Sequence, residues 1–131
     1  MDNPIGASER QEPVLTPNAL DAIIEMIGID DPEVVLDLID TFLADSQRQV
    51  EEMRNSMASG DFKTLHRAAH SMKSSSATFG AMVLSRYCQG LEQSARNDCV
   101  DGACQEQIDQ VAAEHTLVVA ALQEQRARIA G

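Results

Sequence analysis

Aromatic residues are scarce in this chain, which has one tyrosine, three phenylalanines and no tryptophan among its 131 residues. Its apolar positions are filled mainly by alanine, leucine, valine, isoleucine and methionine. Such side chains suit close packing between helices better than the pleated surface of a sheet, where aromatic residues are enriched. The composition therefore predicts an all-α protein.

Positive charge is also in short supply. Lysine and arginine number 10 against 21 aspartates and glutamates, which gives a formal net charge of −11. Bringing such a chain close to a phosphate backbone costs electrostatic free energy. Nucleic acid is therefore excluded as an expected partner.

Long apolar runs are missing as well. No stretch approaches the roughly 20 apolar residues of a membrane-spanning helix. The first twelve residues lack both the basic start and the hydrophobic segment of a secretory signal peptide. We therefore expect a cytoplasmic protein with no membrane association, and Met1 with its short leader favours a free-standing chain.

Cysteine is limited to three residues, Cys88, Cys99 and Cys104. Their number is odd, and their spacing matches neither a paired CxxC zinc site nor a disulfide framework. We expect reduced thiols with a mainly structural role.

Residues 1–15 contain Pro4, Gly6 and Pro13 and show no sustained hydrophobic periodicity. A segment of this kind buries too little apolar surface to offset the entropy of ordering it. We expect a flexible leader over residues 1–15, followed by one domain over residues 16–131.

Start and stop signals divide the domain into helices. Thr16 and Asp31 are each followed by proline, the typical pairing of an N-cap with the first helical position. Amphipathic helices are predicted over about residues 16–28, 31–60, 61–80, 81–96 and a last segment that includes 108–122. Gly90, inside one of them, is expected to mark a close contact between helices.

Four long amphipathic helices joined by short connections satisfy one another's apolar faces as an antiparallel up-down four-helix bundle. The additional short N-terminal helix then covers one end of the bundle. We expect this domain to be a monomer.

One predicted helix carries residues suited to chemistry. Because each residue advances about 100° around a helix, His66, His70, Lys73 and Ala77 form a stripe displaced from the apolar stripe of Leu65, Ala69 and Met72. His70 is therefore expected on the surface. A neutral imidazole has a ring nitrogen with a free lone pair, and this nitrogen can attack phosphorus without a separate base.

The neighbours of His70 favour the same chemistry. Lys73 lies three residues on, where its ammonium can offset charge on phosphoryl oxygens. Ser74 and Ala77 are small, so little bulk blocks the approach of another protein. Phosphoryl transfer depends chiefly on positioning, so this clearance matters.

Other interpretations of these residues remain open at this point. An exposed histidine beside a lysine is more often an ordinary solvated helix face. His66 and His70, spaced i and i+4, share a face and could ligate a metal, but no HExxH arrangement supplies an acidic residue. His115 lies on the apolar stripe of the last helix, where we expect a hydrogen-bonded, semi-buried residue outside any site.

The sequence from Leu65 to Ala81 resembles the signature of histidine phosphotransfer (HPt) domains. An Ala-His pair, Ala69-His70, is followed by Met72 and Lys73, by small residues, and by a Gly-Ala pair. The resemblance extends from Val35 to Leu91-Glu92. One departure is Ser74, where many members have glycine; its hydroxyl could hydrogen-bond a phosphoryl oxygen.

This resemblance implies a four-helix phosphoryl carrier in two-component phosphorelays. It makes His70 the phosphoacceptor and Lys73 its electrostatic support, with docking residues at His66, Ser74 and Ala77. Partners would be receiver domains of response regulators and of a hybrid histidine kinase, and the Mg²⁺ would belong to the receiver. No cofactor or metal of its own is expected. The seven glycines are scattered singly, so a Gly-rich ATP-binding loop is not expected either. The alternative function is a helical interaction module that carries no phosphate.

Overall fold

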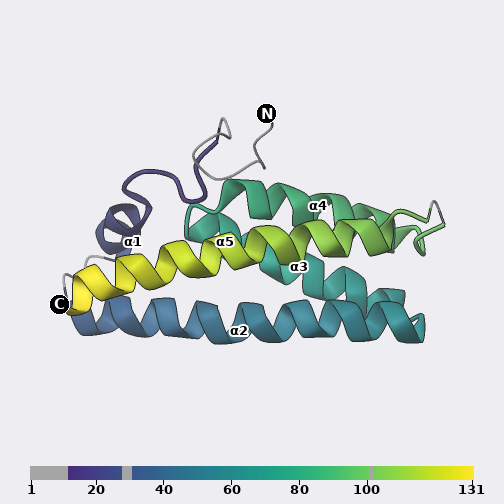
Figure 1. The fold of residues 1–131 in the computed structure, drawn as a ribbon, viewed down its shortest axis with the longest axis horizontal. Coiled ribbons are helices and arrows are strands. Elements are labelled where there is room, and N and C mark those ends of the chain that lie inside the picture. The colour runs from purple at the N-terminus through teal and green to yellow at the C-terminus, as the bar shows by residue number, and fades with distance from the viewer. Residues whose placement is uncertain (1–11, 28–30, 101) are drawn as a thin grey trace, which may run out of the picture.

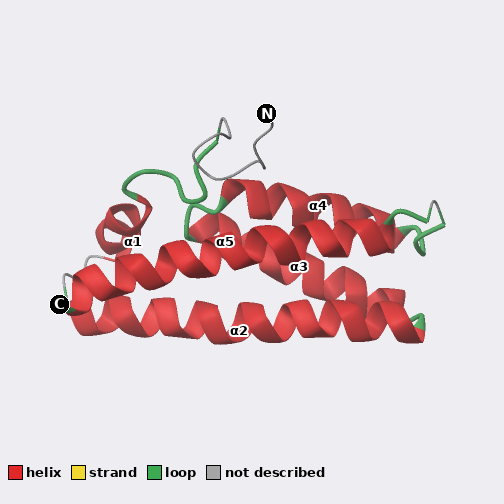
Figure 2. Ribbon diagram, viewed as in Figure 1, coloured by secondary structure: helices red, strands yellow, loops and turns green. Residues whose placement is uncertain are grey.

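A computed structural model describes residues 12–27, 31–100 and 102–131 of the chain. Within these ranges the chain forms five helices and no strand (Figures 1 and 2). The helices are α1 (Ala19–Ile27), α2 (Pro32–Ser59), α3 (Phe62–Thr78), α4 (Met82–Arg96) and α5 (Cys104–Ala130). The prediction of an all-α protein is confirmed.

Helices α2 to α5 form an antiparallel up-down bundle. Each helix packs against the next along the chain, and α5 closes the bundle against α2. The short helix α1 lies at one end, near the start of α2 and the C-terminus (Figure 1). The apolar faces meet in one core, whose fully buried side chains include Ile39, Met53, Leu65, Met72, Leu84, Leu91, Ile108, Val111, Val118 and Leu122.

The turn between α2 and α3 follows the predicted signals. Gly60 ends α2 in the left-handed conformation with φ of 74°, which glycine adopts without steric cost. Asp61 then caps α3, because its side chain accepts a hydrogen bond of 3.1 Å from the backbone N–H of Thr64. This tight connection makes the two helices antiparallel neighbours.

The N-terminal segment differs from the prediction. Helix α1 begins at Ala19, so Thr16 is not its N-cap and Pro17 lies in the turn before it. The backbone N–H of Thr16 instead donates to the carbonyl of Gly80 at 2.8 Å. Gly80 has φ of 78°, and a Cβ there would come within 2.3 Å of the Thr16 hydroxyl oxygen. This close approach explains why a glycine follows α3.

The predicted leader over residues 1–15 is described only in part. Residues 1–11 lie outside the described residues, as does Gly28, the predicted end of the first helix. Val14 and Leu15 are half-buried and pack against the core. For these two residues the expectation of an unpacked segment is wrong, because two apolar side chains suffice for a local contact even without periodicity.

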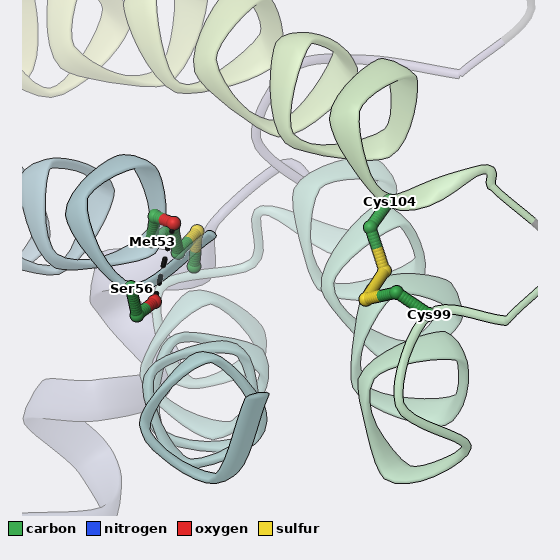
Figure 3. The surroundings of a disulfide bond; sticks show 4 residues. All are labelled: Met53, Ser56, Cys99 and Cys104. Atoms are coloured by element: carbon green, nitrogen blue, oxygen red, sulfur yellow. Dashed lines mark hydrogen bonds between the residues drawn. A yellow bond between two sulfur atoms is a disulfide. The ribbon is translucent and has the colours of Figure 1, made fainter. Parts of the chain in front are cut away.

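The connection between α4 and α5 also corrects a prediction. Cys99 and Cys104 form a disulfide bond (Figure 3), whereas reduced thiols were expected. Asp98, Cys99 and Gly102 all have positive φ, and this sharp turn brings the two sulfur atoms together. The separation of five residues does not predict this disulfide, because its formation depends on the conformation of the loop between the two cysteines. Cys88 is free and buried in α4.

Two further features concern the helices themselves. Gly90 is not a site of tight helix contact, since a Cβ there would meet only the Gln107 side chain at 3.6 Å, an ordinary van der Waals distance. Ser56, a buried polar residue of α2, satisfies its hydroxyl by donating to the carbonyl of Met53 (Figure 3).

No helix in the described part of the chain combines the length and apolar character needed to cross a membrane.

Candidate functional site

The outer face of α3 presents the residues that the sequence singled out. Burial of Leu65, Ala69 and Met72 against the core turns the opposite side of the helix to solvent. The His70 side chain is 58% exposed, and that of Lys73 is 30% exposed. The predicted surface position of His70 is therefore confirmed.

The predicted docking residues lie on the same face. Ser74 and Ala77 are exposed and His66 is half-buried. Ser85 of α4 donates a hydrogen bond of 2.9 Å to the backbone carbonyl of Lys73, which ties this part of α3 to α4. The surface around His70 is thus built on two packed helices and is lined by small side chains on its C-terminal side.

A buried carboxylate lies directly beneath His70. Glu92 comes from α4 and its side chain is only 5% exposed. Its Oε2 atom lies 2.8 Å from Nδ1 of His70, and its Oε1 atom lies 2.8 Å from Nζ of Lys73. One carboxylate therefore joins the two residues that the sequence predicted to act together.

The protonation of Glu92 follows from its surroundings. Burial raises the pKa of this carboxyl, but the hydrogen bonds from Lys73 and His70 and the charges of these two residues together bring the pKa below its ordinary value. The group is therefore an ionised carboxylate at neutral pH, and such a group only accepts hydrogen bonds. Because Nδ1 of His70 faces this acceptor, the ring proton is assigned to Nδ1 and the free lone pair to Nε2.

Two more side chains surround the same carboxylate. Nε2 of His66 lies 3.5 Å and Nη2 of Arg96 3.6 Å from Oε2 of Glu92. The Arg96 and His66 nitrogens are themselves 3.4 Å apart. The imidazoles of His66 and His70 stack with their planes 11° apart and their centroids 6.2 Å apart. Glu92 is thus the common centre of a cluster of cationic and titratable groups.

Sequence reasoning missed Glu92 as a site residue, and it missed Arg96. A signal was present, because Glu92 follows Cys88 by four residues and adjoins Leu91, which places it at the edge of the apolar stripe of α4. A carboxylate at such a position needs a partner. What the sequence did not reveal was which helix supplies that partner.

Other titratable residues in the bundle do not form part of this cluster. His115 is hydrogen-bonded as predicted, with its Nε2 atom 2.8 Å from the Ser46 hydroxyl oxygen, but it is buried and not semi-buried. Burial, together with the charge of Glu92, raises the pKa of the Cys88 thiol to about 12, so this cysteine stays protonated and is a poor nucleophile. Among the described residues, no three His, Cys, Asp or Glu side chains are placed to hold a metal ion.

A shallow groove runs beside the site between α2 and α3. It has a volume of about 180 Å³ and is lined by Leu38, Thr41, Phe42, Asp45, Gln49, Ser75 and Phe79. Phe42 and Phe79 pack with their ring centroids 4.9 Å apart at its base. This mostly apolar surface adjoins the small-residue side of α3.

Comparisons with known proteins agree with this geometry. The family model described as "Hpt domain" matches residues 37–125. Among solved structures, the chain is similar to histidine-containing phosphotransfer protein B (HptB) from Pseudomonas aeruginosa PAO1, with a TM-score of 0.79 and 29% sequence identity. That match covers 88% of this chain and 96% of the other. No curated protein matches significantly. Because the family model spans more than half of the sequence, the chain belongs to the Hpt family of histidine phosphotransfer proteins.

Proposed function

We propose that His70 accepts a phosphoryl group from the aspartate of one receiver domain and passes it to the aspartate of another. The observation that carries this proposal is the 2.8 Å contact between Nδ1 of an exposed histidine and a buried, ionised glutamate. Membership of the Hpt family supports the reaction, and the contact supports the choice of His70 over the other two histidines of the chain.

The transfer step uses the free nitrogen of His70. Nε2 attacks the phosphorus of the receiver's phospho-aspartate, the new N–P bond forms, and the P–O bond to aspartate breaks with release of a carboxylate. Positive charge then develops on the imidazole, and the carboxylate of Glu92 stabilises it through the Nδ1 proton. Transfer to the second receiver is the reverse reaction on a different aspartate.

Lys73 supports the reaction electrostatically. Its ammonium lies 2.8 Å from Oε1 of Glu92, so its first effect is to keep that carboxylate ionised and in place. The same ammonium is one helical turn from His70, where it offsets charge on the transferring phosphoryl oxygens. Lys73 forms no bond to phosphorus in this mechanism.

The partners follow from the chemistry. Receiver domains of response regulators and of a hybrid histidine kinase supply and remove the phosphoryl group, and the Mg²⁺ of the reaction belongs to the receiver's acidic pocket. Docking centres on His66, Ser74 and Ala77, and the apolar groove between α2 and α3 extends the contact. The protein acts as a cytoplasmic monomer that obtains phosphate from receivers and not from ATP.

Incubation with a phosphorylated receiver domain tests this function. Acid-labile, base-stable phosphate should appear on the wild-type chain and be absent from a His70→Gln variant. Lys73→Ala should slow the labelling and leave its final extent unchanged, because it removes a supporting charge and no bond-forming atom. A His66→Gln variant is the matched control and should still be labelled.

Two results would overturn the proposal. Label that persists in the His70→Gln variant would place the phosphate elsewhere. A wild-type chain that binds the receiver and never acquires label would instead be a helical interaction module. Circular dichroism of each variant establishes that the helical bundle is intact before the labelling is interpreted.

A further inference from the structure

The charges of this acidic protein are distributed unevenly among its helices. Helix α3 carries three cations, Lys63, Arg67 and Lys73, and no aspartate or glutamate. Helix α2, its neighbour, carries two arginines against the six carboxylates Glu33, Asp37, Asp40, Asp45, Glu51 and Glu52. The helix that holds the phosphoacceptor is therefore a basic strip on a molecule with a net charge of −11.

Lys63 and Arg67 lie on the same face as His70. At about 100° per residue, both fall within roughly 60° of the direction in which His70 points. Both residues are exposed, and they precede His70 by two turns and by one turn. They extend the basic strip from the phosphoacceptor toward the N-terminal end of α3.

Lys63 and Arg67 differ from Lys73, which is paired with Glu92, and from the arginines on the other long helices. Arg48, Arg54, Arg126 and Arg128 each lie within 4 Å of a carboxylate. In the described part of the chain, Lys63 and Arg67 form no such pair. The acidic group that they do influence is Asp61, whose pKa is lowered first by hydrogen bonds from Thr64 and further by their charges. Their charge is therefore available to a partner.

A groove lies beside these cations. It has a volume of about 240 Å³ and is lined by Phe62, Lys63, His66, Ala95, Arg96 and Asp98, where the start of α3 meets the end of α4. Phe62 and Ala95 give it apolar lining, Lys63, His66 and Arg96 are basic side chains, and Asp98 is its one acidic residue. It leads directly to His66, which stacks on His70.

We propose that this groove and the exposed Lys63 and Arg67 form a docking subsite for an acidic segment of the receiver domain, separate from the groove between α2 and α3. The inference rests on the proposed function, because it takes the partner's phospho-aspartate to lie in an acidic pocket. Opposite charges on the two faces raise the rate of productive encounter and orient the receiver over His70. A partner with a basic face would be repelled by the same strip.

Charge reversal tests this subsite. A Lys63→Glu/Arg67→Glu variant is compared with an Arg48→Glu/Arg54→Glu variant, which changes the net charge equally on α2. The rate constant for transfer from a phosphorylated receiver is measured at low and high ionic strength. Electrostatic steering changes association rates by about 10-fold to 1000-fold, so the α3 variant should be at least about tenfold slower at low salt. The α2 variant should stay within about twofold.

High salt provides the second criterion. At about 1 M ionic strength the Debye length falls to about 3 Å, so the difference between the α3 variant and wild type should nearly disappear. Glutamate at position 63 lies in the first turn of α3, where negative charge favours the helix dipole, so the fold should be kept. If both variants were slowed equally, the change in rate would come from the net charge of the protein and not from its position on α3. If the α3 variant transferred as fast as wild type, Lys63 and Arg67 would not lie in the interface with the receiver. Either result overturns the subsite.

The subsite and the proposed function fail in different ways. The function concerns the final extent of His70 labelling, whereas the subsite concerns its rate and salt dependence. If the wild type is never labelled, the equilibrium affinity for the unphosphorylated receiver still tests the subsite. That affinity should drop in the α3 variant and not in the α2 variant.

Discussion

The two halves of the bundle each contain a histidine held by a 2.8 Å contact, yet only one of these histidines has the exposure and the charged partner that the proposed phosphoryl transfer requires. In the half formed by α3 and α4, Nδ1 of His70 meets the Glu92 carboxylate and the ring is exposed. In the half formed by α2 and α5, Nε2 of His115 meets the Ser46 hydroxyl and the ring is buried. The difference lies in access and in the charge of the partner.

These two factors set the chemistry of each ring. An ionised carboxylate stabilises an imidazole that becomes positive during transfer, whereas a neutral hydroxyl does so only weakly. Burial lowers the pKa of His115, which keeps that ring neutral. The histidine that completes the packed core and the histidine proposed to react thus differ in their surroundings and not in residue type.

Removing the charge of the buried glutamate sharpens this comparison most. A Glu92→Gln variant keeps the side-chain shape but loses the charge that supports His70. Hydrogen bonds to charged groups contribute about 1.5–3 kcal/mol, so transfer should slow by roughly 10-fold to 100-fold. Glu114→Gln, at a buried glutamate of α5, is the matched control and should leave the rate unchanged. The rate of phosphoryl transfer from a phosphorylated receiver is measured for each variant in reactions stopped at successive times. Equal rates for the two variants would contradict the assigned role of Glu92.

Removing the hydroxyl partner of the buried histidine should affect stability alone. Ser46→Ala leaves a nitrogen of His115 without its partner, which costs about 1–3 kcal/mol in the free energy of unfolding. Urea denaturation measures this loss. Ser59→Ala, at an exposed serine of the same helix, should change stability by less than about 0.5 kcal/mol. If the rate of phosphoryl transfer fell more than twofold in Ser46→Ala, the contact between His115 and Ser46 would also matter for transfer, and the proposed division of roles between the two halves would be wrong.

The pH dependence of stability should show the smallest effect. Because burial lowers the pKa of His115, below pH 6.5 the unfolded chain binds a proton that the folded chain does not. This residue therefore makes the protein less stable as pH falls from about 6.5, by at most about 1.4 kcal/mol per pH unit, and has no effect above about pH 7.5. A His115→Gln variant should lose this component, so its free energy of unfolding should fall less steeply below about pH 6.5 than that of wild type. Parallel curves would show that His115 is not the group responsible.

The sequence was sufficient to predict the bundle because its periodicity is strong. The apolar stripe predicted on α3, Leu65, Ala69 and Met72, is fully buried in the structure. The exposed position of His70 followed from the same periodicity. Local geometry of this kind depends only on the helical repeat, so one chain is enough to derive it.

Contacts between helices could not be derived in this way. Glu92 lies 22 residues from His70, and their meeting depends on how α3 and α4 pack. The disulfide between Cys99 and Cys104 depends on the backbone of one loop, where non-glycine residues have positive φ. The hydrogen bond from the backbone N–H of Thr16 to the carbonyl of Gly80 likewise forms only when the N-terminal segment packs on the end of the bundle. Helical periodicity specifies the faces of helices, whereas these features arise from loops and from the pairing of faces.

The most direct test of the central claim is to locate the phosphoryl group on the chain. After transfer from a phosphorylated receiver, ¹⁵N and ³¹P NMR of the histidine side chains identifies the phosphorylated residue and the ring nitrogen. The account predicts phosphate on Nε2 of His70, with His66 and His115 unmodified. Phosphate on Nδ1 of His70, or on either of the other two histidines, would contradict it.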